Sequence, residues 1–343
     1  MNILVTGNNG YIGSRLTQLL LEADYGVVGL DTNYYQDCEF DQFQNPRIRQ
    51  ISKDIRAVSK EDLANIDAVI HLAALSNDPL GAFNPRLTDD VNYLATVKLA
   101  DLAKEVGVRR FLYASSCSLY GVAGEEAVSE DSPMAPVTEY AISKVKSEEA
   151  LTKKADDSFS PVFLRASTAY GISPMLRCDL VVNNLTGWAY TSGKIKIMSD
   201  GSPWRPTVHV EDLGQAYIAC LEAPIEAIHN ETFNVGQNKE NYRIKDMAEL
   251  VKKVVPGCEV EYTHEHGSDS RTYKVSFDKI STRLKGFFKP EWDIEKGVRQ
   301  LYEAYKAHGL TEKEFTGKKY IRLNQLQVLV NNKTIDENLF WRG

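Results

Sequence analysis

The sequence predicts an α/β fold, in which a doubly wound parallel sheet is followed by a smaller, mixed C-terminal lobe. Through the first half of the chain, short apolar runs alternate with amphipathic segments. This alternation is typical of right-handed βαβ units, because each parallel strand needs a crossover to reach the next one. From Tyr170 onward the pattern becomes irregular, and Pro174, Pro203 and Pro206 mark loops. We therefore expect the smaller lobe to begin near residue 170.

The chain opens with a strand, a glycine-rich turn and a helix. Residues 2–5 (Asn-Ile-Leu-Val) form a short apolar run that suits a strand buried on both faces. Glycines at Gly7, Gly10 and Gly13 permit a tight turn and a close approach of the backbone to phosphate. Residues 14–23 continue as an amphipathic helix, whose N-terminal N–H groups attract an anion. This order predicts a dinucleotide site of the Rossmann type.

An acidic residue at the end of the second strand indicates which dinucleotide binds. The glycine spacing is G-x-x-G-x-x-G, not the commoner G-x-G-x-x-G, and Tyr11 and Ile12 complete the turn. Residues 25–30 read as a strand that ends at Asp31. A carboxylate about 20 residues beyond the glycines binds a ribose 2′-hydroxyl and repels a 2′-phosphate. We therefore expect NAD rather than NADP.

Composition excludes several classes of partner. The chain has 343 residues, 43% of them hydrophobic, so it can bury a large core in two lobes. With a net charge of −7 and no basic block, we expect neither a nucleic-acid partner nor an anionic membrane surface. No apolar run approaches the roughly 18 residues that span a bilayer. The glycine turn at residue 7 leaves no space for a signal peptide, so we expect a cytoplasmic protein.

Cysteines and histidines are scattered. The five cysteines are odd in number and contain no C-x-x-C pair, so neither a disulfide framework nor a thiolate zinc site is expected. His264 and His266 flank Glu265, but this polar loop offers no third ligand at helical spacing. We therefore expect no metal site.

The remaining elements follow from the same apolar patterns. Further strands are expected at residues 68–72, 110–115, 161–165 and 233–235, and helices at residues 85–106, 140–154, 180–191, 244–254 and 294–307. A polar tail is expected after Gly309. We expect a dinucleotide-binding domain over residues 1–169, to which residues 205–236 return, and a second lobe with the tail over residues 170–204 and 237–343.

A tyrosine and a lysine share one face of the helix expected at residues 140–154. Tyr140 and Lys144 are four residues apart, so the ammonium can approach the phenol. A nearby ammonium and an oxidised nicotinamide favour the phenolate and lower the tyrosine pKa from about 10 towards neutrality. Tyr140 is then a candidate general base. An amphipathic pair on an exposed helix is the alternative interpretation.

A serine-rich segment strengthens the catalytic interpretation. Residues 114–121 (Ala-Ser-Ser-Cys-Ser-Leu-Tyr-Gly) lie at the end of the strand expected at residues 110–115. The carboxyl ends of parallel strands face the ligand crevice, so the Ser116 hydroxyl can hydrogen-bond a reacting oxygen. A proton-transfer centre beside a dinucleotide site predicts redox chemistry.

Several motifs occur together in the order typical of one family. They are the glycine turn, Asp54-Ile55, His71-Leu72-Ala73-Ala74, Asn92, the serine-rich segment, the Tyr140/Lys144 pair and residues 205–213 (Arg-Pro-Thr-Val-His-Val-Glu-Asp-Leu). On these motifs, residues 2 to about 305 resemble the extended short-chain dehydrogenases/reductases. The likeness is to their NAD-dependent nucleotide-sugar epimerase/dehydratase branch, which includes UDP-glucose 4-epimerase. The resemblance implies NAD as cofactor, a nucleotide sugar as substrate, and a homodimer formed through a helix pair that includes residues 140–154.

The resemblance also assigns roles to matching positions. The catalytic trio is Ser116, Tyr140 and Lys144. The cofactor contacts are Gly7, Gly10, Tyr11, Ile12, Gly13, Asp31, Asp54, Ile55, Leu72, Ala73, Ala74, Asn92 and Lys144, with Asp54 and Ile55 at the adenine. The substrate contacts are Ser76, Ser116, Cys117, Ser118, Asn183, Asn184, Arg205 and Arg271. Asn183 or Asn184 and the two arginines look like diphosphate contacts, since guanidinium groups suit phosphate oxygens. A surface ion pair is the alternative for each arginine.

The residues after Ser116 indicate the reaction. The 4,6-dehydratases of this branch carry an Asp-Glu pair immediately after the catalytic hydroxyl residue, and its decarboxylases carry a Glu where Ser118 stands. Here Cys117 and Ser118 occupy these positions, so epimerisation is favoured, most of all at C4 through a 4-keto intermediate. Cys117 itself is either an acid or a buried small residue.

Two segments leave the substrate open. Residues 168–171 and 173–179 depart from the usual 4-epimerase sequence, and we expect them to face the sugar. One alternative is an NDP-hexose dehydrogenase or ketoreductase. A more remote alternative is a non-catalytic dinucleotide-sensing module, although relatives of that kind typically lose the tyrosine and lysine.

Overall fold

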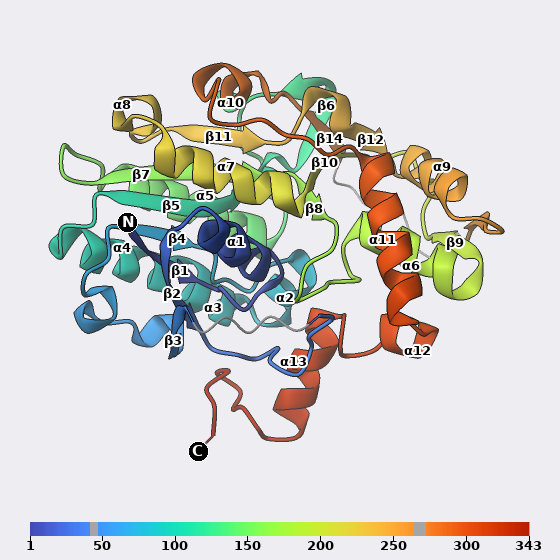
Figure 1. The fold of residues 1–343 in the computed structure, drawn as a ribbon, viewed down its shortest axis with the longest axis horizontal. Coiled ribbons are helices and arrows are strands. Elements are labelled where there is room, and N and C mark those ends of the chain that lie inside the picture. Colours follow the sequence, from blue (N-terminus) through green and yellow to red (C-terminus); the bar gives the residue numbers. More distant parts are fainter. Residues whose placement is uncertain (42–46, 264–271, 343) are drawn as a thin grey trace.

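A seven-stranded parallel sheet forms the centre of the larger lobe. The computed structural model describes residues 1–41, 47–263 and 272–342, and its sheet has the strand order β11-β7-β5-β4-β1-β2-β3 (Figure 1). The strands are β1 (Asn2–Thr6), β2 (Gly26–Asp31), β3 (Ile48–Ser52), β4 (Ala68–His71), β5 (Arg110–Ser116), β7 (Ser160–Ala166) and β11 (Thr232–Val235). The strand order reverses between β1 and β4, which confirms the predicted doubly wound α/β fold.

Helices cover both faces of this sheet because its strands are apolar on both sides. In β1, Ile3 and Val5 join the core beneath α1 (Tyr11–Glu22) and α7 (Val210–Glu222). Leu4 points to the opposite face, where its core includes Leu99 of α4 (Ala95–Glu105) and Leu151 of α5 (Glu139–Thr152). Alternate side chains of a strand face opposite ways, so an unbroken apolar run requires a layer on each side.

The helix expected at residues 85–106 is interrupted. The structure has α3 (Pro85–Thr88), a π-helical turn (Asp89–Leu94) and then α4. In this turn the carbonyl oxygen of Asn92 accepts hydrogen bonds from the Thr96 and Ser147 hydroxyls, at 2.6 and 3.1 Å. A widened turn of this kind is frequent at functional sites, and it directs the Asn92 side chain inward.

Smaller sheets and a second group of helices form the other lobe. The strands are β6 (Val122–Val128) with β14 (Thr272–Val275), β8 (Thr168–Tyr170) with β10 (Trp204–His209) and β12 (Asn241–Arg243), and β9 (Lys194–Ile197) with β13 (Glu259–Tyr262). The main helices are α6 (Val181–Ser192), α9 (Ile244–Val254) and α11 (Ile294–His308), which share one core. Across both lobes, the short helices are α2 (Asp78–Phe83), α8 (Ile225–Ile228), α10 (Asp278–Arg283) and α12 (Glu312–Phe315), and 3-10 turns occur at residues 55–57, 60–63, 117–120 and 238–240. The strand expected at residues 233–235 is the edge strand β11, so the chain does return to the large sheet.

The C-terminal segment is more structured than its polarity suggests. Beyond Gly309 the chain forms α12 and then α13 (Arg322–Asn331), which lies against α2 (Figure 1). Leu326 and Leu339 are buried there against Leu75 and Leu80. The expectation of a polar tail was therefore wrong, because a few widely spaced leucines are enough to attach the segment to the larger lobe. Within the described ranges, no helix combines the length and apolar character needed to cross a membrane.

Candidate active site

A cavity of about 670 Å³ lies at the carboxyl ends of the central strands and extends to the smaller lobe. From the larger lobe it is lined by the glycine turn, the end of β2, the segment after β4 and the end of β5. From the smaller lobe it is lined by residues of α6, β9 and β10. Ligand crevices in open α/β sheets form at this edge, where the strand order reverses.

The glycine turn has no room for side chains. Gly7 has a φ of +74°, and a Cβ built on it would lie 2.8 Å from the backbone nitrogen of Ala73. A Cβ on Gly13 would overlap the carbonyl oxygen of Gly7. Helix α1 begins at Tyr11 with no acidic residue in its first turn, so nothing there offsets the positive end of its dipole. This bare turn at a helix N-terminus fits the pyrophosphate of a dinucleotide.

Asp31, which we predict to bind the ribose, lies at the end of β2 beside the glycine turn. Its Oδ2 accepts from the backbone N–H of Asn9, at 3.1 Å, and its Oδ1 accepts from that of Asn33, at 2.8 Å. Burial raises the pKa of Asp31, while these backbone donors oppose the shift. The bond to Asn9 links the carboxylate directly to the glycine turn.

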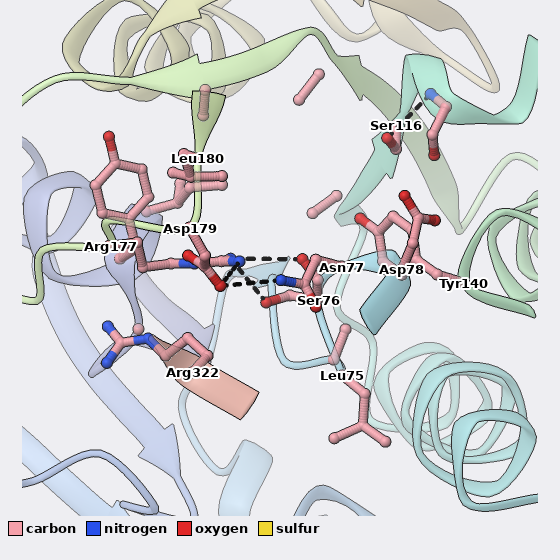
Figure 2. A pocket seen from close by; sticks show the side chains of 18 of the residues that line it. Leu75, Ser76, Asn77, Asp78, Ser116, Tyr140, Arg177, Asp179, Leu180 and Arg322 are labelled. Atoms are coloured by element: carbon pink, nitrogen blue, oxygen red, sulfur yellow. Dashed lines mark hydrogen bonds and ion pairs between the residues drawn. The ribbon is translucent and has the colours of Figure 1, made fainter. Parts of the chain in front are cut away.

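The predicted catalytic residues converge from two elements. Tyr140 and Lys144 lie one turn apart on α5, which begins after the N-cap Thr138, and Ser116 ends β5. All three line the cavity, and Figure 2 shows Ser116 and Tyr140 on the same side of it. The Lys144 side chain is buried, its Nζ donates to the Ala114 carbonyl at 2.6 Å, and Nζ lies 5.5 Å from the centre of the Tyr140 ring.

Burial is the largest influence on the pKa values of Tyr140 and Lys144. It raises the pKa of Tyr140 above its ordinary value, although a hydrogen bond with Ser116 and the charge of Arg177 act in the opposite direction. Burial also lowers the pKa of Lys144 to about 7, and the Glu148 carboxylate opposes that shift. In the protein alone, the Tyr140 pKa therefore moves opposite to the expected direction, because loss of solvent penalises the phenolate more than its neighbours stabilise it.

A buried ion pair supports the helix and strand that carry the catalytic residues. Glu148, one turn beyond Lys144, binds Arg165 of β7 with an Oε2 to Nη2 distance of 2.6 Å. Ser115 donates to Glu148 at 2.5 Å, and Arg165 donates to the Tyr120 hydroxyl at 2.9 Å. The carboxylate therefore ties α5 to β5 and β7, directly behind the site.

Most of the predicted cofactor residues line the cavity. They are Gly7, Gly10, Tyr11, Ile12, Gly13, Asp31, Asp54, Ile55, Leu72, Ala73, Ala74 and Lys144. Asn92 lies behind the wall, where its Oδ1 accepts from the Leu75 N–H at 2.8 Å and its Nδ2 donates to the Leu75 carbonyl at 3.3 Å. Its amide thus holds the segment after β4 in place. Asp54 is bound by the Arg56 guanidinium through two bonds of 2.9 and 2.7 Å.

The predicted substrate residues divide into two groups. Ser76, Ser116, Ser118, Asn184 and Arg205 line the cavity. Cys117 and Asn183 are enclosed behind it. Cys117 Sγ points to the Arg165 carbonyl at 3.1 Å, and burial raises the pKa of the thiol. Asn183 donates to the Arg177 carbonyl at 2.8 Å. Arg271, like His264, Glu265 and His266, lies outside the described residues.

Segment 173–179 carries a buried ion pair that the motifs did not single out. Arg177 binds Asp179 through two bonds of 2.9 and 3.0 Å, and Asp179 accepts from Asn77 at 3.1 Å (Figure 2). Burial alone lowers the pKa of Arg177, but the charge and hydrogen bonds of Asp179 outweigh it, and both groups stay ionised. Arg177 also donates to the Ser76 hydroxyl at 3.3 Å, and both members of the ion pair line the cavity, while their contact with the sugar stays a prediction. The R-x-D spacing is the only sequence signal of this pair.

Two further lining residues come from the C-terminal segment. Arg322 and Leu339 line the same cavity as the glycine turn, about 300 positions earlier in the chain. Sequence patterns contained no signal for this contact, because these residues follow the part of the chain that resembles the family.

Comparison with known proteins agrees with the motifs. The UDP-glucuronate 4-epimerase of Thermodesulfobacterium geofontis is 28% identical over 324 residues, which cover 87% of this chain and 94% of that protein. The crystal structure of UDP-glucuronic acid 4-epimerase from Bacillus cereus, in complex with UDP-glucuronic acid and NAD, has a TM-score of 0.76 at 28% identity and covers 90% of this chain and 99% of that one. TunA, an NAD-dependent NDP-hexosamine 5,6-dehydratase, shares the fold with a TM-score of 0.79 at 22% identity, over 89% of this chain and 98% of its own. The profile of the NAD dependent epimerase/dehydratase family matches residues 3–236, so the chain belongs to that family, as its motif order indicated, and NAD is its cofactor.

Proposed function

We propose that the protein is an NAD-dependent epimerase of a nucleotide-diphosphate sugar and acts at C4. One observation carries this proposal: Ser116, Tyr140 and Lys144 gather in a cavity that also contains the glycine turn. The positions that would hold an added acid for elimination or decarboxylation are Cys117, enclosed in the core, and Ser118. Among the described residues, these two positions therefore supply no carboxyl group for elimination or decarboxylation, and the site is equipped to oxidise and reduce one carbinol.

Each catalytic residue has a defined task. The bound NAD would supply a reversible hydride acceptor beside these residues. Ser116 donates a hydrogen bond to the reacting oxygen, and Tyr140 removes the proton of that hydroxyl and later restores it. The buried Lys144, held by the Ala114 carbonyl, favours the tyrosinate through its charge. Inversion follows when the 4-keto sugar presents its opposite face to the returning hydride, so no net oxidation occurs.

The smaller lobe supplies the groups for the nucleotide diphosphate. Arg205, Asn184 and Lys196 line the part of the cavity formed by β10, α6 and β9. Two cationic side chains and an amide suit diphosphate oxygens. We accordingly assign the NAD-binding domain to residues 1–169, to which residues 205–236 return although Arg205 at their start reaches the sugar nucleotide. The substrate-binding lobe and its tail are residues 170–204 and 237–343. The T. geofontis and B. cereus relatives, both named for UDP-glucuronate, make UDP-hexoses and UDP-hexuronates the first substrates to try.

The proposal is tested by product analysis. The purified protein is incubated with UDP-, GDP-, CDP- and dTDP-sugars, and the products are examined by proton NMR while absorbance at the NADH wavelength is followed. We expect inversion at C4 of at least one sugar with no accumulation of NADH. Stoichiometric NADH would instead indicate a net dehydrogenase, and a new C6 methyl signal or a C5=C6 alkene would indicate a dehydratase. Either result would contradict the proposal.

We also propose that the protein is a homodimer whose interface includes α5. If α5 contributes to it, light scattering on the purified protein gives twice the mass of 38.5 kDa, and the mass of a single chain would contradict the prediction.

A further inference from the structure

We propose that the C-terminal strap, residues 322–342, is part of the NAD site. In this proposal Arg322 donates to an anionic phosphate oxygen of the dinucleotide, and Leu339 covers its adenosine side. The inference depends on the NAD cofactor and not on the reaction at C4. It assigns a cofactor role to a segment that lies beyond the matched family profile, residues 3–236.

Arg322 is the observation that points most directly to an anion. Its guanidinium is buried at the first position of α13 and lines the cavity. Nη2 donates to the Met175 carbonyl at 2.7 Å, and the guanidinium lies 4.4 Å from the centre of the Tyr35 ring. Among the residues that the structure describes, Nη1 is buried and has no hydrogen-bond partner. Burial lowers the pKa of Arg322 and the nearby charge of Arg177 adds to that shift, while Tyr35 and Asp179 oppose it without cancelling it. A buried N–H of a charged group is costly to leave unpaired, and a phosphate oxygen is its natural acceptor.

Leu339 closes the adenosine side of the same cavity. It is buried and shares the cavity lining with Asp31, Asp54 and Ile55, the positions predicted for ribose and adenine. Its φ is +64°, a left-handed conformation that leucine rarely adopts. The turn is held by Asp336, whose Oδ1 accepts from the N–H groups of residues 338 and 340 at 2.9 and 2.8 Å. A strained backbone of this kind persists only where the surrounding contacts over-determine it.

The strap is attached to the loop that follows the ribose-binding carboxylate. The Trp341 indole N–H donates to the Thr32 carbonyl at 2.6 Å, and the Tyr34 hydroxyl donates to the Leu339 carbonyl at 2.5 Å. Phe340 lies 3.8 Å from the Arg56 guanidinium, which itself binds Asp54. These contacts begin one residue after Asp31, so adenosine cannot leave past this loop without disturbing the strap.

The other end of the strap holds the second cofactor loop. Leu326 of α13 packs with Leu75, which directly follows the Ala73-Ala74 segment of the cavity lining, and with Leu80 of α2. The strap therefore connects the loop after β2, the loop after β4 and, through Met175, segment 173–179. If the enzyme is an epimerase, slow release of NAD is useful because the same cofactor returns the hydride; this consequence alone depends on the proposed function.

The test measures cofactor binding rather than turnover. NAD release from the purified holoprotein is timed after dilution into an NAD-consuming trap, and ADP-ribose and adenosine are titrated into protein stripped of NAD. Arg322→Met should weaken ADP-ribose by roughly tenfold or more and leave adenosine binding unchanged. Leu339→Gly, which removes the side chain and relieves the positive φ, should weaken both ligands. Both variants should release NAD faster.

Matched variants separate this effect from general damage. Arg342→Met removes an exposed arginine from the end of the same strap, and we expect wild-type binding. Trp341→Ala removes a side chain that is 42% exposed, and this variant should also release NAD faster. Because the position is exposed, the variant remains informative if the variants of buried residues fail to fold. Phe287→Ala, 41% exposed and outside the cavity lining, is its control. Unchanged ADP-ribose affinity in Arg322→Met, or NAD release in Trp341→Ala equal to that in Phe287→Ala, would overturn the proposal.

Discussion

Lys144 makes the stability of the cofactor-free protein depend on pH, in a direction that its burial determines. The folded protein holds this ammonium with a pKa of about 7, against 10.5 for an ordinary lysine. Between these values the unfolded chain binds more protons than the folded one, so stability rises with pH across this window. Each pH unit above 7 contributes about 1.4 kcal/mol, so the gain by pH 9 is about 3 kcal/mol. Lys144→Met fills similar space without a charge and should lose this dependence.

Urea unfolding of NAD-free protein at pH 6 and pH 9 measures the effect. The free energy of unfolding of the wild type, minus that of Lys144→Met, should grow by about 3 kcal/mol between the two pH values. Terms that do not depend on pH, such as the lost bond to the Ala114 carbonyl, cancel in this comparison. Lys146→Met is the control on the same helix. Its bond to Asp89 raises the Lys146 pKa, so that lysine stays charged in both states across the window. An equal difference at both pH values for Lys144→Met would refute the argument that burial controls this ammonium.

Three further outcomes test the site. Tyr140→Phe should abolish turnover and preserve NAD binding. Its control, Tyr302→Phe, lies on α11 outside the cavity lining and should leave turnover intact. Full activity in Tyr140→Phe would exclude Tyr140 as the base. Asp31→Ala should relax the preference for NAD over NADP, measured by competitive titration, and an unchanged preference would count against its ribose role. Gly13→Ala should lose at least roughly tenfold in NAD affinity and about 1–3 kcal/mol in stability, since the added carbon overlaps the Gly7 carbonyl. At Gly124 an added carbon meets none of the described residues within 4 Å, so Gly124→Ala should match the wild type in both measurements.

Much of the fold was predictable because the signals that specify it are local. The alternation of Ile3, Leu4 and Val5 between two cores follows from strand geometry alone, so an unbroken apolar run already implies helices on both faces. Gly7 requires a left-handed backbone, which glycine adopts without strain. Tyr140 and Lys144 share a face because any helix brings residues four apart together.

For two pairs of consecutive residues in the predicted site, only the tertiary structure shows which side chain faces the cavity. Asn183 and Asn184 are consecutive on α6, yet Asn184 faces the cavity and Asn183 is enclosed behind it. Ser116 and Cys117 differ in the same way at the end of β5. Which of two adjacent side chains reaches a cavity depends on how the whole element is rotated against its neighbours, and packing from distant segments sets that rotation.

By itself, the sequence determined the alternation of strands and helices in the first half of the chain, the bare glycine turn, and the presence of a phenol, an ammonium and a hydroxyl at one edge of the sheet. These depend on backbone sterics and on periods of two and 3.6 residues, which short stretches of chain contain in full. Only the tertiary structure decided the direction of the Tyr140 pKa, the pairing of Arg177 with Asp179, and the position of Arg322 and Leu339 beside the cofactor loops. Desolvation and contacts across about 300 residues are properties of the assembled core, and no local pattern encodes them.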